Sequence, residues 1–193
     1  STAEEALAQL EERHFDMVIV MVGADKQMPV NFSKIIREKF PYIPVYLLLN
    51  NNAELAYFER NPTLTRNIDK LFVWNGDSKI FFAMVKHLED RVNVENDTRV
   101  GLVRVILLVE DSVKYYSRYL QLLYSIVLEQ TRQLIEDVNA DELYKVLKLR
   151  ARPKILLASD YEEAIAIYHK YRDFMLCVIT DVKFKRNNIY DEE

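Results

Sequence analysis

The stretch VILLVEDS, residues Val105–Ser112, decides the fold that we expect for this chain of 193 residues. Its first five residues are continuously apolar, which is typical of a parallel strand covered on both faces. Two acids, Glu110 and Asp111, follow the strand directly, and a helical pattern begins at Ser112. A strand that ends in acids and turns at once into a helix predicts an α/β fold with polar groups at the carboxyl edge of a parallel sheet.

Similar apolar runs recur along the chain and alternate with helical patterns. Six runs have the length of a strand: Met17–Val22, Val45–Leu49, Leu71–Val73, Val103–Val109, Ile155–Ala158 and Leu176–Thr180. Helical patterns occupy the intervals: Glu4–Glu12, Asn31–Phe40, Ala53–Glu59, Ser78–Asp90, Ser112–Asp137 and Tyr161–Tyr171, with a further helix near Glu142–Leu149. This alternation predicts parallel strands joined by right-handed helical crossovers.

An internal repeat links the two ends of the chain. The segment EEALAQLEERHFDMVIVMV, which begins at Glu4, matches EEAIAIYHKYRDFMLCVITDV, which begins at Glu162. Each copy has a helix that opens with Glu-Glu-Ala, then a charged turn, then a strand that contains Val-Ile. In this alignment the second copy has Asp181 at the end of its strand where the first copy has Met21.

A polar stretch separates two units. Residues Val92–Gly101 are weakly patterned and contain one of only three glycines, so we predict a linker over 93–101 between a first unit at 1–92 and a second unit at 102–193.

Three carboxylates are expected at one edge of the second unit's sheet, because Glu110, Asp111 and Asp181 each follow a strand. Oxygen ligands that leave room for waters and a phosphate suit Mg²⁺. With this cation neutralising the charge of an incoming phosphoryl group, a free oxygen of Asp181 is placed to act as a nucleophile and form an aspartyl phosphate. The alternative is that these acids are ordinary solvated residues at strand ends.

These motifs resemble the receiver domains of two-component response regulators. VILLVEDS (Val105–Ser112) is similar to the first strand with its acidic pair, KILLASDYEEAIAIY (Lys154–Tyr168) to the second strand and helix, and LCVITDVKF (Leu176–Phe184) to the third strand. The resemblance implies a flavodoxin-like, receiver-like parallel sheet flanked by helices. It also implies that Glu110 and Asp111 bind Mg²⁺ and that Asp181 accepts phosphate from a histidine kinase or another phosphodonor.

The first unit resembles the later part of a second, degenerate receiver. Met21 stands at the phosphoacceptor position, Trp74 at the position of the family's lysine, and Leu49 or Asn50 at the hydroxyl position. A thioether cannot accept a phosphoryl group and an indole cannot pair with one. We therefore expect this unit to serve packing or interaction.

Both receiver-like units are incomplete, and their missing strands are complementary. In a sheet of order 2-1-3-4-5, the first unit has strands three to five and the second has strands one to three, so we interpret the chain as a piece of a longer protein. We hypothesise that Val103–Val109 and Ile155–Ala158 complete the first unit's sheet, within one chain or swapped between two copies in a homodimer.

The whole pattern is similar to the N-terminal regulatory region of bacterial proteins that continue into a phosphoenolpyruvate synthase or pyruvate phosphate dikinase-like enzyme. The similarity is carried by VWNGDSKIFFAMVKHLEDR (Val73–Arg91), VEDSVKYYSRYL and RARPKILLA. It implies a regulatory segment that acts on a catalytic domain of the same polypeptide; the alternative is a scaffold that is never phosphorylated. Catalysis by this segment itself is disfavoured, because its sequence has no Gly-rich phosphate loop.

Composition excludes several other classes of protein. Half the residues are apolar and 29% are charged, with a net charge of −4, so disordered chains and nucleic-acid binders are disfavoured as classes. No apolar stretch reaches the roughly 20 residues of a membrane helix. Cys177, the single cysteine, lies in an apolar run and is expected to be a buried thiol in a reducing, cytoplasmic compartment.

Overall fold

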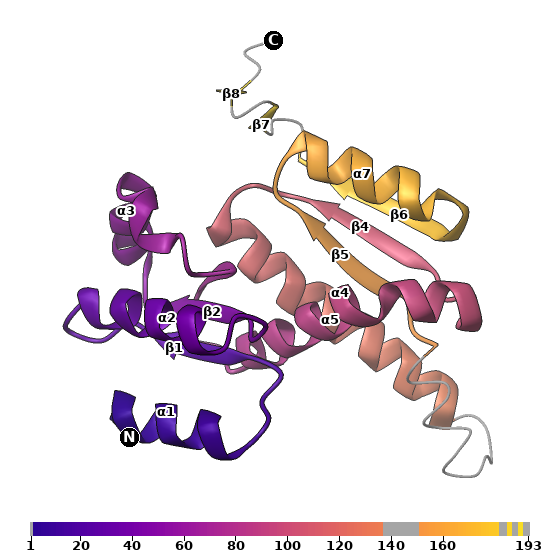
Figure 1. Cartoon of the computed structure of the whole chain (residues 1–193). Coiled ribbons are helices and arrows are strands. Elements are labelled where there is room, and N and C mark those ends of the chain that lie inside the picture. The colour runs from indigo at the N-terminus through magenta and orange to yellow at the C-terminus, as the bar shows by residue number, and fades with distance from the viewer. Residues whose placement is uncertain (1, 137–150, 182–184, 187–188, 191–193) are drawn as a thin grey trace. The chain divides into compact units, whose positions relative to one another are not determined.

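The computed structural model describes residues 2–136, 151–181, 185–186 and 189–190. The chain divides into two compact units, Ser1–Asp77 and Ser78–Glu193, which we describe separately (Figure 1). Each unit contains a three-stranded parallel sheet flanked by helices. The predicted α/β class with parallel sheets is therefore confirmed, in the form of two small sheets.

The first unit has its strands in the order β1-β2-β3, all parallel. Its elements are α1 (Ala3–Glu12), β1 (Val18–Met21), α2 (Gln27–Lys39), β2 (Val45–Leu49), α3 (Asn52–Arg60), a 3₁₀ turn (Pro62–Thr65) and β3 (Lys70–Val73). The central strand β2 is paired on both edges and contacted by α2 and α3. This explains why its five consecutive apolar residues are all buried.

The second unit has its strands in the order β5-β4-β6, also parallel. Its elements are α4 (Lys79–Gly101), β4 (Val105–Val109), α5 (Val113–Glu136), β5 (Lys154–Ala158), α7 (Tyr161–Tyr171), a 3₁₀ turn (Arg172–Phe174), β6 (Met175–Thr180) and the antiparallel pair β7 (Lys185–Arg186) and β8 (Ile189–Tyr190). The chain passes from β4 to β5 on one side and returns to β6 on the other. Right-handed crossovers in opposite directions place α5 and α7 on opposite faces of the sheet, as Figure 1 shows.

All six predicted strands form, and α1 to α5 and α7 follow the predicted helices. The structure differs at Val92–Gly101, where the sequence predicts a linker and α4 continues as one helix. Val94 and Thr98 lie one turn apart and are both buried, so this polar stretch has an inward face that stabilises a helix. The helix ends at Leu102, whose backbone is left-handed with φ of 50°. The helix predicted near Glu142–Leu149 lies outside the described residues.

Strand β4 is hydrogen-bonded on both edges, to β5 and to β6. The hypothesis that Val103–Val109 and Ile155–Ala158 complete the first unit's sheet is therefore wrong for this chain, since β4 has no edge left for β1. A swap between two copies through β4 would first require β6 to leave. Among the described residues, the outer sides of β5 and β6 are the unpaired edges of the second sheet, and of these two strands β5 is buried and β6 is largely exposed.

Helix α4 is held against β5 by a buried cluster of charges. The carboxylate of Asp90, which is fully buried, accepts two hydrogen bonds from the guanidinium of Arg152, at 2.7 and 3.0 Å, and one from the backbone N–H of Ile155, at 2.8 Å. The Nζ of Lys154 lies 2.7 Å from Asp97 and 3.8 Å from Asp90. Although burial lowers the pKa of the Arg152 guanidinium, its hydrogen bonds and charge interaction with Asp90 raise the pKa overall.

Replacing Asp90 by alanine removes the main acceptor of this cluster and leaves Arg152 buried without its bidentate partner. We expect the D90A variant to lose about 3–5 kcal/mol of unfolding free energy, as for one partner of a buried ion pair, measured by urea denaturation. The control is E95A, which removes a partner of the exposed Glu95–Lys170 pair and should leave the unfolding free energy nearly unchanged. Equal small effects from both variants would contradict a structural role for the cluster.

Candidate functional site

The carboxyl ends of β4 and β6 bring Glu110 and Asp181 together. The two strands run in register, with Val109 beside Thr180, so the next residue of each strand is an acid. The backbone N–H of Glu110 donates to the carbonyl of Ala158 at 3.0 Å, and that of Asp181 donates to the carbonyl of Val109 at 3.3 Å. The sheet ladder therefore continues through both acids and fixes their backbones at neighbouring positions.

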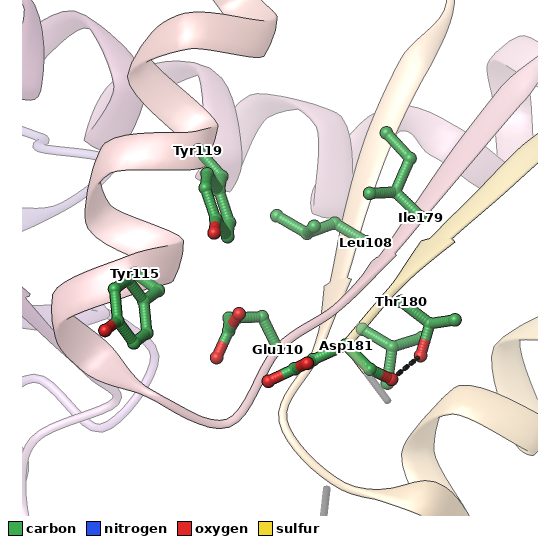
Figure 2. A pocket seen from close by; sticks show the side chains of 8 residues that line it. Leu108, Glu110, Tyr115, Tyr119, Ile179, Thr180 and Asp181 are labelled. Atoms are coloured by element: carbon green, nitrogen blue, oxygen red, sulfur yellow. Dashed lines mark hydrogen bonds between the residues drawn. The ribbon is translucent and has the colours of Figure 1, made fainter. Parts of the chain in front are cut away.

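A hollow of about 470 Å³ opens above these strand ends, and we call it the acidic hollow. Its lining consists of Leu108, Val109, Glu110, Tyr115, Tyr119, Ile179, Thr180 and Asp181. Figure 2 shows the carboxylates of Glu110 and Asp181 next to each other, with the two tyrosine rings of α5 on one side. The Thr180 hydroxyl donates to the backbone carbonyl of Asp181 at 2.8 Å. Since a water molecule takes about 30 Å³ of liquid volume, the acidic hollow has room for a phosphoryl group with several waters.

Glu110 is the buried member of the acidic group, with 3% of its surface exposed. Its Oε1 accepts a hydrogen bond from the backbone N–H of Ser112 at 3.0 Å. Burial raises the pKa of the Glu110 carboxyl; the Ser112 hydrogen bond lowers it, and the charges of Asp181 and Asp111 raise it again. The pKa of Glu110 rises overall mainly because burial disfavours the charged carboxylate, and the hydrogen bond from Ser112 offsets only part of that effect.

Asp111 lies at the turn between β4 and α5. Its Oδ2 is buried and has no hydrogen-bond partner within the described residues. A buried carboxylate oxygen without a donor costs free energy unless a cation or water reaches it. The Oδ2 of Asp111 is therefore an acceptor that a water or a cation can reach, although Asp111 itself is not among the residues that line the acidic hollow.

No group of three or more His, Cys, Asp or Glu side chains in the described part of the chain is arranged to hold a metal ion. Mg²⁺ does not require such a group, because it keeps several waters and is usually bound through one or two carboxylates together with phosphate oxygens. The donors present, which are Glu110, the orphaned oxygen of Asp111 and the exposed Asp181, fit this open mode of binding. They do not form a closed cage of protein ligands.

The chain was compared with family models, curated proteins and solved structures. None of them matches. The interpretation of the acidic hollow therefore rests on its own geometry. Among the described helices, none is both long and apolar enough to cross a membrane.

The corresponding edge of the first unit has no acids at the strand ends. Met21 ends β1 and is exposed, and Trp74 follows β3, its backbone N–H donating to the carbonyl of Leu49 at 2.7 Å. The side-chain amide of Asn50 donates to the carbonyl of Val22 at 2.7 Å and so ties the ends of β1 and β2 together. Met21 and Trp74 lie at strand ends, as predicted. At this edge the hydrogen bond from Asn50 to Val22 joins two strand ends without a ligand.

The tyrosines of the acidic hollow are the part of the site that the sequence analysis missed. Tyr115 and Tyr119 stack with their ring centroids 6.2 Å apart and an interplanar angle of 16°. Their i, i+4 spacing in the first two turns after the acidic pair was the available signal. They form an apolar wall beside Glu110.

Strand β6 corrects the expectation for Cys177. The thiol is exposed, not buried, because β6 is an edge strand on which Leu176 to Thr180 are all exposed. A run of apolar residues alone predicts a central strand, whereas the sheet order places β6 at an edge of the sheet among the described residues.

Replacing Glu110 by glutamine tests whether the buried charge of this carboxylate destabilises the fold. Because folding raises the pKa of Glu110, the protonated form of this carboxyl stabilises the fold. That contribution is complete below the ordinary pKa of 4.5 and is lost as the pH rises through the pKa of the folded state. We expect E110Q to be more stable than the wild type at neutral pH without divalent cations, with the difference vanishing below pH 4.5. Thermal unfolding from pH 3 to pH 8 measures this, with the exposed Glu162→Gln as the control; an E110Q variant less stable at pH 7 would contradict it.

Proposed function

We propose that the second unit is a receiver-like phosphoacceptor module in which Asp181 accepts a phosphoryl group. The observation that carries the proposal is the side-by-side placement of Glu110 and Asp181 at the ends of two paired parallel strands, at the mouth of the acidic hollow. Ligands of open parallel sheets bind at this edge. The strand order supports a flavodoxin-like fold, because β5-β4-β6 and β1-β2-β3 are the two overlapping halves of the order 2-1-3-4-5.

In the proposed step an oxygen of the Asp181 carboxylate attacks the phosphorus of a phosphodonor. The new P–O bond forms while the bond from phosphorus to the leaving group breaks, and the electron pair departs with that group, an imidazole or a carboxylate. Glu110 and Asp111 would hold Mg²⁺, which when bound supplies positive charge to the phosphoryl oxygens. Tyr115 and Tyr119 line the acidic hollow on the side of α5, and in this proposal their rings shield that side of the acyl phosphate from water.

This activity suits a regulatory segment and not an enzyme in its own right. We infer that a histidine kinase or a small phosphodonor supplies the phosphoryl group in the cytoplasm. We further infer that the signal acts on a phosphoenolpyruvate synthase or pyruvate phosphate dikinase-like catalytic domain of the same polypeptide. The first unit, whose strand ends are tied together through Asn50, is proposed to serve as an interaction surface. The second candidate, a scaffold that is never phosphorylated, is favoured by the absence of a three-carboxylate metal group in the described residues.

Phosphorylation of the whole chain separates the two candidates. Incubation with acetyl phosphate and Mg²⁺ should increase the intact mass by one phosphoryl group, and the increase should be lost in D181N and strongly reduced in D111N. The matched control is D173N, since Asp173 is an exposed acid in the same unit and its variant should be phosphorylated like the wild type. No mass increase in the wild type, or an increase that survives in D181N, would overturn the proposal.

Binding of Mg²⁺ gives an independent readout without a phosphodonor. A cation that binds only the folded state stabilises it by about 1.4 kcal/mol at ten times its Kd. We expect MgCl₂ to raise the Tm of the wild type, and to raise it less in D111N and E110Q than in D173N. A shift of equal size in all four proteins would indicate a general salt effect and would contradict a Mg²⁺ site in the acidic hollow.

A further inference from the structure

Strand β6 is apolar in sequence and yet exposed along most of its length. Leu176 is 52% exposed, Val178 45% and Ile179 39%, and Cys177 and Thr180 are exposed too. Because successive side chains point to opposite faces of a sheet, β6 has exposed side chains on both faces. The strand also lies at an edge of the described sheet (Figure 1). Such an edge is a template for pairing with a further strand.

The internal repeat identifies a strand that matches β6 and has the neighbour that β6 lacks. In the alignment of the two copies, β1 matches β6, with Val18 at the position of Val178 and Val20 at the position of Thr180. A helix precedes each strand, α1 before β1 and α7 before β6. In the first unit β1 pairs with β2, and Val20 is only 6% exposed. The two matching strands therefore differ in burial because they differ in their neighbours.

Hydrogen bonds show which edge of β1 is paired. The backbone N–H of Val18 donates to the carbonyl of Pro44 at 2.9 Å, and the N–H of Val22 donates to the carbonyl of Leu48 at 3.2 Å. Backbone groups alternate between the two edges along a parallel strand, so Val20 also faces β2. The residues of β1 that bond to β2 are therefore those at even positions, from Val18 to Val22.

The matching positions of β6 face outward. The backbone N–H of Asp181 donates to the carbonyl of Val109, on β4, at 3.3 Å. By the same alternation, the N–H groups of Val178 and Thr180 point away from β4. These two positions match the residues of β1 that bond to β2. The outer edge of β6 is therefore the same edge by which the first copy of the repeat pairs with a parallel, continuously apolar strand.

We propose that the outer edge of β6 docks an extended apolar segment of a partner protein, which adds to the sheet as a parallel strand and makes the hydrogen bonds that β2 makes to β1. The β2 strand of a second copy does not fit this role, because it is already paired on both edges. A two-fold contact between two β6 strands does not fit either, since it would be antiparallel. Strand addition is a recurring mode of peptide recognition. This docking does not depend on phosphorylation of Asp181.

The probe is a synthetic peptide of residues 42–52, YIPVYLLLNNN, extended by two lysines for solubility. In β2 the carbonyls of Val45 and Leu49 accept hydrogen bonds from the side of β3, so the odd positions face β3 and the even positions face β1. N-methyl groups on Leu47 and Leu49 block the edge that is not needed and prevent stacking of the peptide. The matched control peptide has its N-methyl groups on Tyr46 and Leu48, which removes the donors of the docking edge.

Amide hydrogen exchange of the full chain, measured by NMR, reports the added strand. With nine-tenths of the chain bound, we expect the first peptide to slow exchange of the Val178 and Thr180 amides about tenfold, because these amides then exchange only in the free tenth. The control peptide should leave both rates unchanged. Equal effects of the two peptides, or no effect of either, would overturn the proposal, and so would protection of both amides in the chain without peptide.

A variant of β6 tests the edge from the side of the protein. V178P removes the outward N–H and leaves the hydrogen bonds to β4 in place, since proline is tolerated on an edge strand. We expect V178P to lose binding of the peptide and the control V178T, which keeps the N–H, to bind it like the wild type. Circular dichroism checks that both variants are folded.

Self-association is the competing use of this edge. Sedimentation equilibrium of the wild type without peptide should give the mass of a monomer at every concentration. A mass that rises with concentration and is restored to the monomer by V178P overturns the proposal and assigns the edge to a second copy. Binding of the peptide that survives in V178P also overturns it.

Discussion

The second unit depends on the pairing of β4 with a strand on each of its edges. All five side chains of β4 are buried, and the ladder of hydrogen bonds on both sides fixes where the strand ends. The ladder continues past the strands, because the backbone N–H of Glu110 donates to Ala158 and that of Asp181 donates to Val109. The sheet therefore fixes the positions of both acids. A free loop would have to lose conformational entropy to bring the same carboxylates together.

The two units use the same kind of edge in opposite ways. In the first unit the Asn50 amide satisfies the carbonyl of Val22, so the strand ends are joined by internal hydrogen bonds. In the second unit the pKa of Glu110 is raised, and the Oδ2 of Asp111 has no hydrogen-bond donor among the residues that the structure describes. The repeat in the sequence therefore reflects similar local folding of a helix and a strand, while the chemistry of the two edges differs.

Much of the fold follows from local sequence, because continuous apolar runs and helical spacing depend on neighbours within a few residues. Val45–Leu49 and Tyr161–Tyr171 form with the predicted bounds. Glu110 and Asp181 lie at the ends of two paired parallel strands, as the rule for such sheets predicts, while the third expected carboxylate, Asp111, is not among the residues that line the acidic hollow. The extent of α4 and the exposure of Cys177 do not follow, since they depend on what lies beside them. Residues 92–101 are helical because they pack through Val94 and Thr98. Cys177 is exposed because it lies on β6, which is an edge strand among the described residues.

Tyr115 and Tyr119 line the acidic hollow on the side of α5. Their rings stack with the centroids 6.2 Å apart, so a change in the rotamer of one ring disturbs the packing of the other. The two rings also replace water on one side of the Glu110 carboxylate. The lower local dielectric constant on that side strengthens any charge interaction made by this carboxylate.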